Sequence, residues 1–133
     1  MTLERVRAWF ERLPPAERDL PIIILEGVAY TPRMILAEVS RGTPLGERLQ
    51  AMVETGRLGT TMAEVESLAK LRLKELLSRL PPDKPIVATL GIPEKTYTPR
   101  ELLREIEMQT EAGRQWVEAE IRTMRRVLEM ARR

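Results

Sequence analysis

The tetrapeptide Tyr-Thr-Pro-Arg stands at residues 30–33 and again at residues 97–100, an offset of 67 residues. A second word, Arg-Leu-Pro-Pro, occupies residues 12–15 and 79–82 with the same offset. Two proline-containing words that share one offset indicate an internal duplication with a pseudo-two-fold relation between the copies. The first copy is expected to span residues 1–59 and the second residues 60–133. Together they are expected to form a single domain over residues 1–133.

The repeated words also predict the secondary structure of each copy. Each pair of prolines ends a helix, because proline removes a backbone donor and disfavours helix in the residue before it. Short β-branched runs with turns at residues 26–27 and 91–93 then predict a small hairpin. Thr31 and Thr98 should cap the helices that follow, each with proline at the first position. The expected fold class is mainly α with short β-hairpins (α+β), a tandem duplication of a helix–Pro-turn–hairpin–helix unit.

The C-terminal region is predicted to form one long helix. Thr43 and Gly46 match Thr110 and Gly113, but only the first copy also has the breaking sequence Arg-Gly-Thr-Pro. A helix over residues 99–131 would be roughly 45 Å long, whereas a domain of this size is about 30 Å across. We therefore expect its apolar stripe to bind another subunit or a second copy of the chain. The partner-binding residues predicted on this basis are Trp116, Val117, Ile121, Met124 and Leu128.

Five arginines are candidates for contact with an anion or with nucleic acid, namely Arg33, Arg100, Arg122, Arg125 and Arg126. The first two lie at expected helix N-termini, where backbone N–H groups also favour an anion. We favour the alternative in which threonine caps the helix and arginine pairs with a nearby glutamate. The other three lie where acidic residues are few, which suits phosphate groups, although cations are also favourable at any helix C-terminus.

The residue types that the chain lacks restrict its chemistry. It contains no Cys, His or Asn, so it has neither a thiol nucleophile nor an imidazole for acid–base work. We expect no catalytic, cofactor-binding or metal-binding residue, and no enzyme activity. The absence of Cys and Asn together with dense Glu and Arg charge favours a thermophilic source, and a GC-rich genome is the alternative explanation for the excess of Arg over Lys. The absence of a signal peptide or a long apolar run predicts a cytoplasmic protein without membrane insertion.

These observations lead to a functional hypothesis with two alternatives. A non-enzymatic interaction or scaffold protein is expected, acting as a small accessory or assembly subunit whose partner is another protein or a second copy. The first alternative is a small nucleic-acid-associated protein that uses the arginine-rich C-terminal helix. The second is a viral or phage structural protein.

Overall fold

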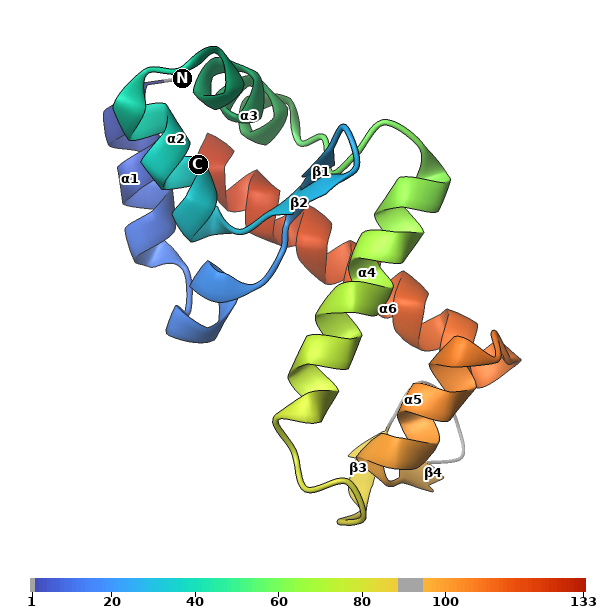
Figure 1. Cartoon of the computed structure of the whole chain (residues 1–133). Helices are drawn as coiled ribbons and strands as arrows, with labels where there is room; N and C mark the ends of the chain where they lie inside the picture. The colour runs from blue at the N-terminus through green and yellow to red at the C-terminus, as the bar shows by residue number, and fades with distance from the viewer. Residues whose placement is uncertain (1, 89–94) are drawn as a thin grey trace.

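The computed structural model describes residues 2–88 and 95–133, and it is mainly helical with two short antiparallel hairpins (Figure 1). The first half contains α1 (Leu3–Arg12), the 3₁₀ helix η1 (Pro15–Asp19), β1 (Ile23–Leu25), β2 (Val28–Tyr30), α2 (Pro32–Arg41) and α3 (Pro44–Thr55). The second half contains α4 (Met62–Ser78), β3 (Ile86–Ala88), β4 (Lys95–Tyr97), α5 (Pro99–Glu107), α6 (Glu111–Glu129) and the 3₁₀ helix η2 (Met130–Arg132). The predicted fold class is confirmed.

The two halves place equivalent residues in equivalent elements. Tyr30 pairs with Ile23 across the first hairpin, and Tyr97 pairs with Ile86 across the second. The predicted turn at residues 26–27 joins β1 to β2, with both residues in the left-handed region of backbone space, as a two-residue hairpin turn requires. The turn predicted at residues 91–93 lies outside the described residues. This correspondence agrees with a duplication, while the pseudo-two-fold relation between the halves stays a prediction.

Threonine caps begin the helices after both hairpins, as predicted. Thr31 Oγ1 accepts a hydrogen bond from the backbone N–H of Met34 at 3.1 Å, and Thr98 Oγ1 accepts one from Glu101 at 3.1 Å. The Glu101 carboxylate also accepts from the Thr98 backbone N–H, which completes a reciprocal capping box. The Tyr-Thr-Pro-Arg words are therefore helix-start signals.

Replacing Thr31 or Thr98 with Ala should lower the free energy of unfolding by about 0.5–2 kcal/mol per site, because a backbone donor at the helix start loses its partner. Urea denaturation of each variant measures the loss. Thr31→Ser is the matched control, since serine keeps the acceptor oxygen and should remain close to wild type. Two alanine variants as stable as wild type would contradict the capping role.

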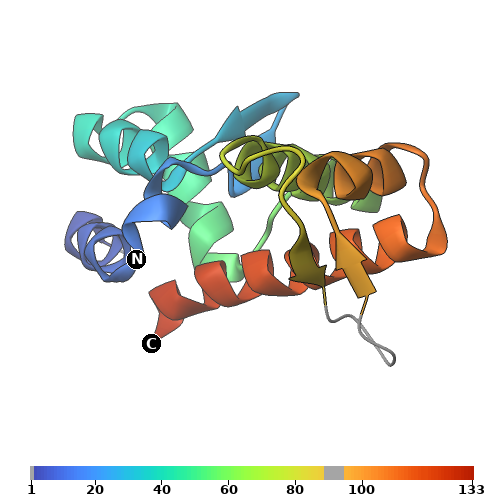
Figure 2. The ribbon, with the colours of Figure 1, turned by 90° about the horizontal axis from the view of Figure 1, so that it is seen from below.

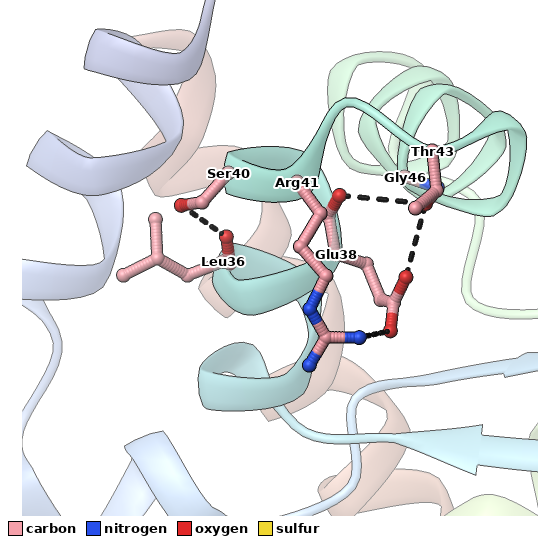
Figure 3. A network of polar contacts seen from close by, with 6 residues as sticks. All are labelled: Leu36, Glu38, Ser40, Arg41, Thr43 and Gly46. Atoms are coloured by element: carbon pink, nitrogen blue, oxygen red, sulfur yellow. Dashed lines mark hydrogen bonds and ion pairs between the residues drawn. The ribbon is translucent and has the colours of Figure 1, made fainter.

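Each half also contains a sharp corner between two helices. Thr43 caps α3 by accepting from the Gly46 backbone N–H at 2.9 Å, and its hydroxyl lies 3.0 Å from Glu38 Oε2 (Figure 3). The same two contacts recur 67 residues later, where Thr110 caps α6 at Gly113 and its hydroxyl donates to Glu105. A Cβ atom at either glycine would overlap the carbonyl oxygen of that glutamate. Glycine therefore lets the two helices of each corner approach closely.

The prediction of one uninterrupted helix over residues 99–131 is wrong. Helix α5 ends at Glu107, and α6 begins at Glu111. Gln109 turns the chain between them in the left-handed conformation, at φ 53°, and the Thr110 cap starts the new helix. The match between Thr110-x-x-Gly113 and Thr43-x-x-Gly46 was the signal for this corner. The corner of the second copy forms without the proline and the extra glycine that the first copy has at Pro44 and Gly42.

Helix α6 connects the two halves of the molecule (Figure 2). Its body contacts α4, and its C-terminal end lies beside α1, where Trp9 Nε1 donates to the Val127 carbonyl oxygen at 2.8 Å. One continuous core results, to which both halves contribute fully buried side chains such as Val6, Trp9, Ile35, Leu49, Leu68, Leu102, Met124 and Leu128. None of the helices within residues 2–88 and 95–133 is both long and apolar enough to cross a membrane.

Candidate functional site

The solvent-facing side of α6 carries a concentration of exposed arginines. Arg122, Arg125 and Arg126 are all exposed, as are Arg132 and Arg133 beyond the end of the helix. Among the described residues, no carboxylate lies within ion-pair distance of Arg122, Arg125 or Arg126. Ion-paired arginines are found in other elements instead. The structure thus brings together the three C-terminal arginines that the sequence singled out.

Helix α1 extends this positive region. A hollow of about 360 Å³ lies between α1 and the C-terminal end of the chain, lined by Arg5, Ala8, Glu11, Arg12, Ala131 and Arg133. Arg12 Nη2 donates to the Met130 carbonyl oxygen at 3.0 Å, which fixes α1 against η2. The arginine surface is defined here as the exposed residues Arg5, Arg12, Arg122, Arg125, Arg126, Arg132 and Arg133.

The arginine surface is not uniformly positive. Glu118 and Glu129 are exposed on α6, and Glu11 lines the hollow. Arg122, Arg125 and Arg126 still outnumber these two glutamates of α6, and Arg5, Arg12 and Arg133 outnumber Glu11 around the hollow. Residues Arg122 and Arg126 are one helical turn apart, and Arg126 Nε lies 3.5 Å from the Arg122 carbonyl oxygen. Their guanidinium groups therefore belong to one continuous row.

Arg33 and Arg100, the other two anion-contact candidates, are occupied by aspartates. Arg33 Nε lies 2.8 Å from Asp19 Oδ1, and Arg100 Nε lies 3.1 Å from Asp83 Oδ1. These are the only two aspartates in the chain, so the arginine of each Tyr-Thr-Pro-Arg word pairs with the single aspartate of its own half. We expected each arginine to pair with a nearby carboxylate, and it does, but the carboxylate belongs to an aspartate and not to a glutamate.

The hydrogen bond from Arg33 lowers the pKa of Asp19 below its usual value, and the positive charge of Arg33 acts in the same direction. A carboxyl whose pKa is depressed by folding contributes stability at pH values above its unfolded pKa, and loses that contribution as the pH falls through its folded pKa. Both side chains are more than half exposed, so solvent screening keeps the effect small. The pair therefore orients the start of α2 more than it stabilises the fold.

The five predicted partner-binding residues do not form an uncovered stripe. Val117, Ile121, Met124 and Leu128 are buried in their own chain, and Trp116 is partly buried against the same core. The expectation that the stripe lies beyond the reach of the core is wrong, because α6 is shorter than predicted and both halves pack against it. Ile121→Glu would therefore place a charge in the core and test stability rather than assembly.

A buried cluster of charges that was not predicted from the sequence lies between the halves. Arg72 on α4 is 1% exposed. Its guanidinium lies 2.8 Å from Glu120 Oε1 on α6 and 2.5 Å from Glu17 Oε1 on η1, and it donates to the Pro21 carbonyl oxygen at 2.9 Å. The contact with Glu17 is an ion pair without hydrogen-bond alignment. The available signal was the helical spacing, which places Arg72 in the apolar stripe of α4.

The structure offers no constellation for metal binding among the residues that it describes, since no three potential acidic ligands come together there. A second concave region lies beside α4, where two hollows share Lys70 and Ile106. Their volumes are about 100 and 340 Å³. The exposed Leu71 lines the larger hollow, and polar side chains such as Glu66 and Glu107 surround the region.

Comparisons of the chain with protein-family models, with curated proteins and with solved structures found no match.

Proposed function

We propose that the arginine surface binds a polyanion and that the chain is a small nucleic-acid-associated protein without catalytic activity of its own. The observation that carries this proposal is the row of exposed arginines on α6 that lack a carboxylate partner among the described residues. Arginine presents a planar fork of N–H donors that matches two oxygens of one phosphate. Such contacts release counterions from nucleic acid and supply most of non-specific binding.

The character of this surface argues against other partners. The large apolar side chains exposed in the described residues are Val28, Met34, Met62, Leu71, Leu80 and Met108, and none of these belongs to α6. A helix that enters a lipid surface needs an apolar face directed toward the lipid. The centre of a protein interface is usually depleted of charge and enriched in aromatic residues. An arginine row without apolar neighbours suits phosphates better than either.

The test is a triple substitution, Arg122→Gln, Arg125→Gln and Arg126→Gln, assayed by fluorescence anisotropy with a labelled duplex of about 20 base pairs. Wild type should bind with an affinity that falls steeply between about 50 and 200 mM salt. Each phosphate contact contributes about 0.9 to the slope of log K against log salt concentration. Loss of three contacts should therefore reduce that slope by about 3 and weaken binding at low salt.

A matched control removes the same charge from elsewhere on the surface. Arg41, Arg48 and Arg100 are exposed and paired with Glu38, Glu26 and Asp83. Their replacement by Gln leaves the net charge equal to that of the triple variant, and binding should stay close to wild type. Equal losses in the two variants would mean that overall charge, rather than the arginine surface, determines binding. No binding by wild type at low salt would refute the proposed function.

The hollows beside α4 favour a second candidate function, a protein contact of the accessory-subunit kind. Leu71 is 40% exposed there, and the polar rim includes both Lys70 and Glu107. A rim with charges of both signs suits contact with a second copy of the chain, because an isologous interface must be complementary to itself. Sedimentation at a protein concentration of about 100 μM tests this candidate, because a dimer with a micromolar dissociation constant would be populated at that concentration. A monomer with unchanged behaviour after Leu71→Glu would remove it.

A further inference from the structure

We infer that the arginine surface binds duplex rather than single-stranded nucleic acid, and that it does so without reading base sequence. This inference rests on the proposed function and narrows it to one class of ligand. Its basis is the combination of an arginine row on a helix whose end is fixed with the positions of the five aromatic side chains, which all lie elsewhere.

The aromatic residues of the chain lie in the core or, in the case of Phe10 on α1, against arginines of η1 and α2. Trp9 is fully buried, Tyr97 is buried, and Trp116 and Tyr30 are partly buried against the core. The Phe10 ring lies beneath the guanidinium groups of Arg18 and Arg33, at 5.1 and 5.2 Å. No aromatic side chain therefore belongs to the arginine surface.

Proteins that bind single strands usually depend on such rings. Stacking of a base on an aromatic side chain strengthens binding by about five- to 150-fold per base. Without stacking, a flexible single strand offers only its phosphates, and it must be ordered to match a fixed row of cations. A single strand also carries half the charge density of a duplex along its axis. The arginine surface should consequently favour the duplex.

The backbone that carries the arginine row is fixed against the rest of the molecule. Arg122 and Arg126 lie one turn apart on α6, about 6 Å along its axis at 1.5 Å per residue, and Arg132 and Arg133 follow beyond the end of that helix. The end of α6 is fixed by the hydrogen bonds from Trp9 to Val127 and from Arg12 to Met130. A duplex presents a phosphate about every 1.7 Å along its axis. Arginines carried on a helix fixed in this way can therefore contact several phosphates of one duplex without ordering the ligand.

The same surface lacks the side chains that read bases. Asparagine is absent from the chain, and Gln115 is the one amide side chain on α6. It precedes Arg122 by nearly two helical turns, so it lies away from the centre of the row. Arginine can also contact guanine in the major groove. However, this row does not present the carbonyls, amides and apolar groups that normally complete a base-reading surface. Contact with phosphates is therefore the mode of binding that all its arginines share.

The experiment is a competition assay with the full chain, at about 100 mM salt, against a labelled 24-base-pair DNA duplex. The unlabelled competitors are the same duplex, a second duplex of unrelated sequence, a duplex RNA, oligo(dT) with the same number of phosphates, and inorganic polyphosphate. The two DNA duplexes should compete within about threefold of one another. Oligo(dT) and polyphosphate should compete at least about tenfold more weakly per phosphate. If duplex RNA competes as well as the DNA duplexes, the protein binds the phosphates that both kinds of duplex share. If duplex RNA competes more weakly than the DNA duplexes, the ligand is duplex DNA.

The outcomes separate this inference from the function on which it rests. Oligo(dT) or polyphosphate that competes as well as the duplex would overturn the preference for duplex while leaving polyanion binding intact. A large difference between the two DNA sequences would overturn sequence-independent contact. Failure of wild type to bind the labelled duplex and labelled oligo(dT) at low salt would refute the proposed function itself. The triple variant at Arg122, Arg125 and Arg126 should lose duplex binding in the same assay, whereas the Arg41, Arg48 and Arg100 control should retain it.

Discussion

Arg72→Met should lower the free energy of unfolding by about 3–5 kcal/mol, the cost of removing one partner from a buried charge cluster. Arg72 is 1% exposed, and its partners Glu17 and Glu120 are 14% and 11% exposed. Without the guanidinium, both carboxylates would remain largely removed from water with no cation between them, and the Pro21 carbonyl would lose its donor. Urea denaturation followed by circular dichroism measures the change in stability.

Two controls identify the cause of this loss. Arg41→Met removes an exposed arginine from its pair with Glu38, and should change stability by less than about 1 kcal/mol. Replacing Arg72, Glu17 and Glu120 together with Met should recover much of the loss, because apolar side chains of similar volume can substitute for a buried ion cluster. If Arg72→Met were as stable as Arg41→Met, the cluster would not hold the halves together. A triple variant no better than the single one would point to lost packing instead.

Gly113→Ala should also destabilise the protein, by about 1–3 kcal/mol or more, as overpacking against a fixed backbone does. The new Cβ would overlap the Glu105 carbonyl oxygen and the adjoining backbone. Helix propensity alone predicts the opposite sign, since Ala is about 1 kcal/mol more favourable than Gly inside a helix. The direction of the change therefore reports on the approach of α5 to α6.

Gly46→Ala at the equivalent corner should behave in the same way, because its Cβ would overlap the Glu38 carbonyl oxygen. Gln115→Ala is the control within α6, since Gln115 is exposed and its replacement should change stability by only a few tenths of a kcal/mol. The midpoint of urea denaturation compares the variants. A higher midpoint for Gly113→Ala would show that the corner opens at little cost and that glycine is not required there.

The helix starts could be predicted from sequence because their signals are local. Thr31 and Thr98 followed by proline begin helices where expected, and Thr61 with Glu64 forms a capping box at the start of α4. A cap depends on contacts within three or four residues. The corner at Thr110 was also encoded locally, but it was missed because glycine inside a helix is ambiguous. Gly113 is required by a neighbouring helix, and no local pattern reveals that neighbour.

The candidate site could likewise be predicted from the sequence only in part. Helical spacing and composition were sufficient to single out Arg122, Arg125 and Arg126 on one helix. They could not show that α1 adds Arg5 and Arg12 to the same surface, because that contact joins residues more than 100 positions apart. The role of Arg33 and Arg100 also depended on distance in space, since their aspartate partners are 14 and 17 residues away.

The amino-acid sequence by itself determined where helices begin, which face of each is apolar and that equivalent words recur in both halves. These properties follow from backbone sterics, capping and side-chain periodicity, which act over a few residues. Only the tertiary structure decided what covers the apolar face of α6 and why Arg72 stands within an apolar stripe. Periodicity identifies a face that must be buried, but burial is satisfied equally by a second copy or by the other half of the same chain. Here both halves of the same chain cover that face, because α4 and α5 pack along the body of α6 and the corner at Thr110 directs its C-terminal end against Trp9.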